Sequence, residues 1–219
     1  MDRSGVAPFS EETAEGVRAG HPDAVGEVYV ILADRLLGYL RARVRDQATA
    51  EDLLEQTFLE LLQKGHTIRG GAAAIKVWLF RAAHFNALDH IRRISRRAED
   101  LAEDLEVFES FEAADPDLGP EDQAVATDTR RRVREGLRHL SEDQRQVLLL
   151  RYVAGLTAPE VAVVLRKSDG AIRSLQHRGE RSLARILGAE EGAADDTGQK
   201  SSMTAVPSRP RSASQQRQR

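Results

Sequence analysis

Cysteine is absent from the 219 residues, which excludes disulfide bonds, thiolate nucleophiles and zinc or iron–sulfur sites with cysteine ligands. No apolar run approaches the roughly 20 residues that a membrane span needs. The N-terminal segment also lacks the apolar stretch of a secretory signal. We therefore expect a protein of the reducing cytoplasm that has no contact with a membrane.

The net charge of −3 conceals a strong division of charge along the chain. Residues 17–97 carry a net charge of +4 and residues 129–187 carry +7, whereas residues 98–128 hold 12 acidic and no basic side chains. Two basic blocks separated by an acidic block indicate a nucleic-acid partner more strongly than the total charge does.

The same blocks predict the domain organisation. We expect an N-terminal extension over 1–16, a helical domain over 17–97, a flexible acidic linker over 98–128 and a second helical domain over 129–187. Two proline-containing turns interrupt the linker, at Asp115-Pro116 and Leu118-Gly119-Pro120. The tail over 188–219 is nearly empty of large apolar residues, so we predict that it is disordered.

The fold class is predicted to be all-α, with two small helical domains. Apolar residues recur at three- and four-residue spacing and predict helices over about 23–45, 50–62 and 75–97. The stripe of the second helix consists of Leu53, Leu54, Phe58, Leu61 and Leu62. In the third helix we assign Trp78 and Phe85 to the core, and Phe80 and His84 to the exposed surface.

The second domain reads as a helix-turn-helix. Ser141 with Gln144, and Thr157 with Glu160, form capping-box patterns, and Ser168 predicts the start of a further helix that runs to about Ile186. The helix after the turn at 166–168 is expected to enter the DNA major groove. Its outward face carries arginines that suit guanine or phosphate oxygens.

The stretch from Leu140 to Tyr152, followed by Gly155-Leu156-Thr157 and Ser168–Leu175, resembles region 4 of bacterial sigma factors, especially of the extracytoplasmic-function (ECF) branch. In that family the module binds the −35 promoter element and the flap of the RNA polymerase β subunit. The resemblance implies −35 DNA contacts from Ser168, Ala171, Arg173, Ser174, His177, Arg178 and Arg181.

Two residues depart from the pattern of region 4. Arg166 stands where the family usually has a turn glycine, and a left-handed backbone there would be strained. Gly179 replaces a usual alanine inside the recognition helix, at an expected cost of about 1 kcal/mol.

Residues 50–59 resemble the region 2 helix that ECF sigma factors place against the clamp helices of the β′ subunit. The resemblance implies a contact with core RNA polymerase through Asp52, Glu55 and Gln56. Leu53, Thr57 and Phe58 are expected to pack inward.

The segment from Trp78 to Arg93 resembles the helix that reads the −10 element on the melted non-template strand. Arg92, Arg93, Arg96 and Arg97 fall within about 140° of the helix circumference and form a basic stripe. Asp89 is expected to pair with Arg93. The resemblance implies −10 DNA contacts from Asn86, Asp89, Arg92, Arg93 and Arg96.

The loop over 64–74 matches the family loop that lines the site of the unstacked −10 base. Gly65, Gly70 and Gly71 permit close backbone approach there. The sequence does not tell which residue of this loop touches the base.

Taken together, these features imply an ECF sigma factor that binds core RNA polymerase and directs initiation at promoters, through duplex −35 DNA and single-stranded −10 DNA. No enzymatic activity, cofactor or metal is expected. The resemblance also implies an anti-sigma factor as a partner, although no residue points to one. The alternative is a stand-alone helix-turn-helix regulator with an N-terminal helical sensing domain, which would need neither polymerase nor Arg92 and Arg93.

Overall fold

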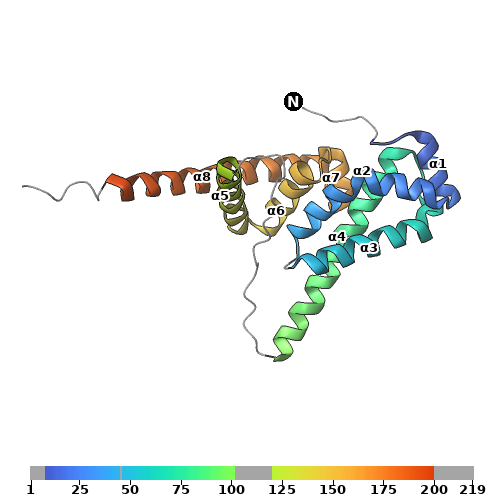
Figure 1. Ribbon diagram of the computed structural model, residues 1–219, viewed down its shortest axis with the longest axis horizontal. Helices are drawn as coiled ribbons and strands as arrows, with labels where there is room; N and C mark the ends of the chain where they lie inside the picture. Colours follow the sequence, from blue (N-terminus) through green and yellow to red (C-terminus); the bar gives the residue numbers. More distant parts are fainter. Residues whose placement is uncertain (1–7, 45, 102–119, 200–219) are drawn as a thin grey trace, which may run out of the picture.

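The computed structural model describes residues 8–44, 46–101 and 120–199, and every regular element in these ranges is a helix (Figure 1). The all-α prediction is therefore confirmed. The predicted linker residues from 102 to 119 and the tail from 200 to 219 lie outside the described ranges. None of the helices in the described part of the chain has the length and apolar character needed to cross a bilayer.

The N-terminal module, residues 8–101, contains the three predicted helices and one that was not predicted. Its elements are α1 (Glu11–Ala19), α2 (Pro22–Arg41), α3 (Gln47–Lys64), the short 3-10 helix η1 (Gly65–Thr67) and α4 (Ala72–Leu101). The unpredicted helix is α1, which Ser10 caps by accepting a hydrogen bond from the Thr13 amide. It belongs to the fold because Ala14 and Val17 are buried.

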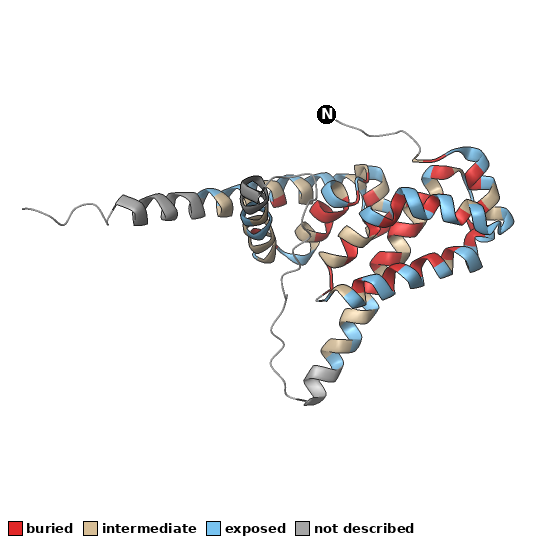
Figure 2. Cartoon of the chain, viewed as in Figure 1, coloured by how far each residue is buried: buried red, intermediate tan, exposed pale blue. Residues whose placement is uncertain are grey.

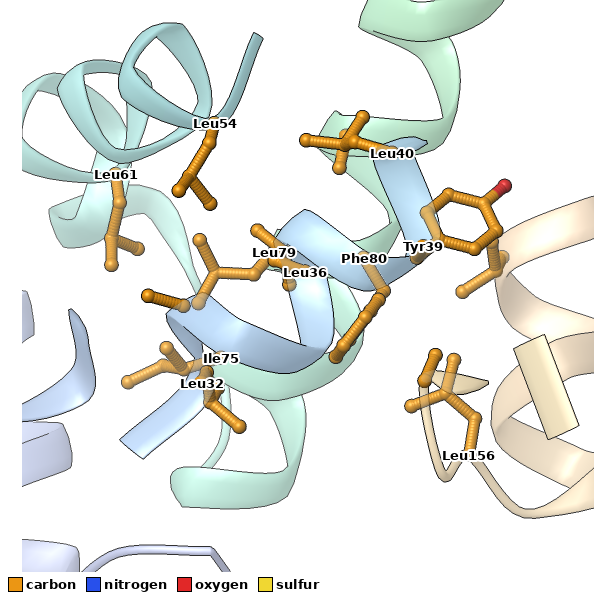
Figure 3. Close-up of a cluster of buried hydrophobic side chains, with 14 of the residues drawn as sticks. Leu32, Leu36, Tyr39, Leu40, Leu54, Leu61, Ile75, Leu79, Phe80 and Leu156 are labelled. Atoms are coloured by element: carbon orange, nitrogen blue, oxygen red, sulfur yellow. The ribbon is translucent and has the colours of Figure 1, made fainter. Parts of the chain in front are cut away.

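The core of this module forms where α2 meets α3 and α4. Buried leucines at four-residue spacing line one face of α2, so that this face can pack along its full length. Figure 3 shows them opposite side chains of α3 and α4, and the labelled residues of this cluster are Leu32, Leu36, Leu40, Leu54, Leu61, Ile75 and Leu79. Leu62, which the sequence placed on the buried stripe of α3, is instead 42% exposed.

The C-terminal module, residues 120–199, contains the predicted helix-turn-helix. Its elements are α5 (Pro120–Arg138), α6 (Glu142–Leu148), the π-helical turn η2 (Leu149–Val153), α7 (Ala158–Leu165) and α8 (Asp169–Gln199). Both capping boxes are confirmed, because the Ser141 and Thr157 hydroxyls accept from the amides of Gln144 and Glu160. The Ser168 hydroxyl likewise accepts from the Ala171 amide at 3.2 Å.

Three helices, α4, α5 and α8, extend into segments that the sequence assigned to the linker or the tail, and α4 ends at Leu101. α5 begins at Pro120, inside the expected linker, and proline is well suited to a first helical turn. α8 continues past Leu187 to Gln199, into the segment that composition indicated to be disordered. Residues 188–199 contain three glycines as well as three alanines, so helix propensity does not explain this extension.

The two modules pack against each other. Leu156, on the loop before α7, faces Tyr39 and Phe80 of the N-terminal module, and all three are fully buried (Figure 3). The Lys76 ammonium forms an ion pair with Glu160 at 2.6 Å, and Arg43 forms one with Glu142. Figure 2 shows that buried residues continue across the junction of α2, α4 and α7.

His84 lies in this shared interior. It is only 4% exposed, and its Nδ1 forms a 2.8 Å hydrogen bond with the Tyr39 hydroxyl. Burial, assisted by the positive charge of Arg43, lowers the pKa of His84 to about 4. The imidazole is therefore neutral in the folded protein at pH 7.

The buried imidazole makes stability depend on pH. Between pH 6.5 and 4 the unfolded chain binds a proton that folded His84 excludes, so stability falls as the pH falls through this window. We expect the free energy of unfolding to be about 2 kcal/mol lower at pH 5 than at pH 7. Urea titrations at both values measure this difference. His84→Gln should remove most of this pH-dependent difference, whereas His66→Gln, at an exposed site, should preserve it. Equal stability of the unsubstituted protein at the two pH values would contradict the lowered pKa of His84.

Candidate nucleic-acid interface

The predicted acidic face of α3 is exposed. Asp52, Glu55 and Gln56 all face solvent, whereas Leu53 and Thr57 are buried, as their spacing predicted. The Thr57 hydroxyl donates to the Leu53 carbonyl at 2.7 Å, which satisfies the buried polar group within its own helix. The three predicted polymerase contacts thus share a single accessible face.

Large apolar side chains accompany this acidic face. Leu59 is 49% exposed and Leu62 is 42% exposed, and they follow Glu55 by four and seven residues, which places them beside it on α3. Tyr29 of α2 adds a half-exposed ring that packs on Phe58 with 4.8 Å between ring centroids. Such a mixture of apolar and acidic groups is typical of a protein-binding surface.

The outer face of α8 presents the predicted duplex-reading residues together. Arg173, Ser174, His177, Arg178 and Arg181 are all exposed, whereas Ile172 on the opposite face is fully buried. Arg173 pairs with Asp169 at 2.7 Å, one helical turn earlier. Ser168 and Ala171 lie in and just after the turn, at the end of α8 that would approach a groove first.

A polar network that the sequence did not reveal fixes the back of α8 to the π-helical turn η2. The Arg151 Nε atom donates to Gln176 at 3.1 Å, and the Gln176 amide donates to Glu180 at 2.8 Å. The Tyr152 hydroxyl also donates to Glu180. The wider π turn sets which side chains face α8, and capping signals in the sequence do not predict such a turn.

The two departures from the region 4 pattern now have structural consequences. Arg166 ends α7 in the left-handed conformation, with φ of 53° and ψ of 42°, so the predicted strain at the turn is confirmed. Gly179 is buried, and a Cβ there would lie 3.3 Å from Leu148 of α6. The glycine therefore lets α6 and α8 approach closely, which offsets its expected penalty.

On α4 the predicted basic stripe is exposed, because Arg92, Arg93 and Arg96 all face solvent. The predicted pairing of Asp89 with Arg93 is wrong. Asp89 lies 3.7 Å from Arg92, three residues on, whereas Arg93 contacts His90 Nδ1 at 3.3 Å. The carboxylate therefore pairs with the arginine three residues on instead of the one four residues on. The side chain of Arg97 lies outside the described set.

Asn86 is half-buried between α4 and α3. Its amide donates to the Thr57 hydroxyl at 3.3 Å and to the Glu60 carboxylate at 3.1 Å. These bonds tie the two helices together, so a contact between Asn86 and DNA stays a prediction.

The assignment of rings along α4 was wrong for Phe80, His84 and Phe85. Phe80 is fully buried and His84 is 4% exposed, whereas Phe85 is partly exposed. Trp78 is partly buried and packs against the core, as predicted. Helices of both modules pack on α4: α1, α2 and α3 from its own module, and α7 from the C-terminal module. The apolar pattern of α4 alone does not reveal that α7 packs on it.

Two glycines of the loop before α4 allow close contact with α1. A Cβ on Gly65 would lie 2.8 Å from the Val17 carbonyl oxygen, and one on Gly71 would overlap the Glu11 carboxylate. Glu11 also accepts from the Ala72 amide at 3.2 Å, and Arg18 donates to the carbonyl of Gly70. The side chains that this clamp leaves exposed are Lys64, His66, Thr67 and Arg69.

Comparisons with known proteins agree with this arrangement. The family descriptions "Sigma-70 region 2" and "Sigma-70, region 4" match residues 28–97 and 130–183. The ECF RNA polymerase sigma factor SigK of Mycobacterium tuberculosis is 31% identical over 173 residues, which cover 77% of this chain and 89% of SigK. The chain belongs to the ECF RNA polymerase sigma factors.

Other sigma factors support this membership. CarQ of Myxococcus xanthus is 31% identical over 81% of this chain and 97% of its own length. The ECF sigma factor BldN of Streptomyces coelicolor is 32% identical over 80% of this chain, although the match spans 65% of BldN. These relatives confirm the resemblance seen in the sequence and give no support to a stand-alone regulator.

Two solved structures share the ECF sigma-factor fold. CnrH in complex with the cytosolic domain of CnrY covers 82% of this chain and 97% of its own, with a TM-score of 0.58 and 21% identity. The sigma factor RpoE in complex with the anti-sigma factor NepR from Bartonella quintana covers 74% of this chain and 96% of its own, with a TM-score of 0.60 and 20% identity.

The packing of α6 against α8 predicts opposite outcomes at two glycines of the recognition helix. Gly170 has open space around a Cβ, so Gly170→Ala should stabilise the protein by up to about 1 kcal/mol. Gly179→Ala should give no such gain, because the new methyl group presses on Leu148 and Gln144. Urea midpoints of the two variants measure the difference. Equal stabilisation would contradict the prediction, because it would show that α6 moves away from the new methyl group at no cost.

Proposed function

We propose that this sigma factor binds core RNA polymerase and directs promoter-specific initiation in the cytoplasm. The proposal rests on two separate exposed basic surfaces, one on α4 and one on α8. They occur in one chain, in the same order as in the sigma-factor family. A regulator that reads only duplex DNA has no need of the first surface. Initiation itself requires no chemistry from the sigma factor, because nucleotide transfer belongs to the polymerase.

Duplex −35 DNA is the proposed ligand of α8. Arg173, Ser174, His177 and Arg178 lie on its outer face in the first half of the helix, which is the part that enters a major groove. Arginine reads guanine with two hydrogen bonds, and the remaining groups suit phosphate oxygens. Asp169 holds Arg173 against the helix, so the guanidinium is partly ordered before DNA arrives.

The melted −10 strand is the proposed ligand of α4. Arg92, Arg93 and Arg96 offer phosphate contacts along the exposed end of the helix. The exposed side chains of the preceding loop, among them His66 and Arg69, extend the set of groups available to a single strand.

Core polymerase is the proposed partner of the acidic face of α3. Asp52, Glu55 and Gln56 supply hydrogen-bond acceptors for a basic surface, and Leu59 and Leu62 supply apolar area beside them. The sigma factor RpoE, which shares this fold, was solved with the anti-sigma factor NepR, which supports an anti-sigma factor as a further partner.

Promoter binding requires the two modules to separate. The −35 and −10 elements lie about 25 base pairs apart, which is about 85 Å along B-form DNA at 3.4 Å per base pair. In this structure the two modules share a buried interior, in which Leu156 of one module lies against Phe80 of the other. Modules packed in this way cannot contact both promoter elements at once. The packed arrangement therefore belongs to the protein before it engages a promoter.

Transcription in vitro tests the proposal directly. Core polymerase and this protein, on a promoter library, should initiate at a defined class of sequences that core polymerase alone ignores. A failure to initiate anywhere, together with no binding to core polymerase, would refute the function.

Two arginine variants separate the proposed roles. Arg93→Ala should slow open-complex formation on duplex promoters, with a smaller defect on templates that are already melted over the −10 element. Arg173→Ala should weaken −35 duplex recognition by about 1–3 kcal/mol, and premelting should not restore it. Arg185→Ala, an exposed arginine farther along α8, is the matched control. If each substitution impaired the other step instead, the assignment of the two surfaces would be wrong.

A further inference from the structure

Phe85 lies in line with the arginines of α4. At 100° per residue, Arg81, Arg92 and Arg96 fall within about 40° of Phe85 around the helix axis. Phe85 is partly exposed, unlike Phe80 on the inner face, which is fully buried. This face of α4 therefore carries Phe85, the partly exposed Trp78 and a row of guanidinium groups in which Asp89 is the one acid.

The ring of Phe85 is covered from the other module. The Arg166 guanidinium carbon lies 5.3 Å from the ring centroid, and that of Arg81 lies 5.9 Å away. Arg166 occupies the turn between α7 and α8, where its positive φ makes a non-glycine residue strained. A cation above an aromatic ring is attracted to it, so the contact with Phe85 compensates part of that strain.

An accessible aromatic ring beside arginines is the combination that binds single-stranded nucleic acid, and Phe85 is partly exposed. Bases stack on such rings whatever their identity, and the guanidinium groups follow the phosphates. We propose that Phe85 stacks a base of the melted promoter strand, and that Arg166 occupies the same ring while the two modules are packed together. The inference rests on the proposed function and adds to it a stacking residue and the group that blocks it.

Competition follows from the geometry, because one ring face holds either a guanidinium or a base. Packing of the turn against α4 therefore covers the ring, and movement of the C-terminal module toward −35 DNA uncovers it. Capture of the strand is thereby coupled to separation of the modules, with Arg166 as the residue that links the two events.

Binding of single-stranded DNA to the full-length protein tests this coupling. The probe is a fluorescein-labelled oligonucleotide pool of about 15 random nucleotides, a length on the scale of known single-strand sites, with affinity measured by anisotropy. Arg166→Gly should bind about two- to fivefold more tightly than the unsubstituted protein, although it has lost a positive charge. Arg185→Ala, which loses a charge from the same module, should bind equally or more weakly.

A second pair of variants isolates the ring. In the Arg166→Gly background, Phe85→Leu should weaken binding about tenfold, whereas Phe85→Tyr should retain it, because tyrosine also stacks. Thermal unfolding establishes that each variant is folded. The proposed blocking of the Phe85 ring by Arg166 is refuted if Arg166→Gly binds the oligonucleotide no more tightly than Arg185→Ala does. The stacking role is refuted if Phe85→Leu is without effect or if Phe85→Tyr is equally weakened.

The same proteins, assayed with core polymerase, distinguish this inference from the proposed function. If the unsubstituted protein directs initiation and Phe85→Leu initiates equally well, the inference fails and the function stands. If the oligonucleotide results hold but no protein directs initiation, the proposed function fails, and with it the assignment of the bound strand to a promoter.

Discussion

The burial of one face of α4 is the constraint on which the other surfaces depend. Ile75, Leu79 and Ala83 lie against the interior with no exposed area, and a rigid helix turns by a fixed angle per residue. Once these positions are buried, the direction of every other side chain on α4 is determined. Arg92 and Arg96 face outward for this reason.

The contact between the modules is defined by charge as much as by apolar area. Arg43 is almost completely buried and meets Glu142, and Lys76 meets Glu160 at 2.6 Å. Although burial opposes ionisation of Glu142, the Arg43 charge and neighbouring hydrogen bonds lower its pKa to about 2. Removing two charges from water offsets much of their attraction. Such pairs therefore fix the orientation of the modules more than they strengthen the contact.

The sequence predicted those features that arise locally. Capping boxes, the helix-turn-helix and the outward arginines depend on residues within a few positions of one another, and Ser141 or Thr157 signals them directly. Features that depend on distant partners were missed. Phe80 and Phe85 exchanged their expected environments because α7 packs on α4, and no periodicity within α4 encodes that contact. The clamp of Glu11 on the loop before α4 was missed for the same reason.

The carboxylate of Glu160 has two tasks at once. One oxygen accepts from the Thr157 amide and completes the capping box at the start of α7, and the other accepts from the Lys76 ammonium. Because the capping box already fixes this side chain, meeting the lysine costs little further conformational freedom. Losing the lysine likewise leaves the start of α7 intact. The ion pair between the modules can therefore form or break while the helix cap of α7 stays in place.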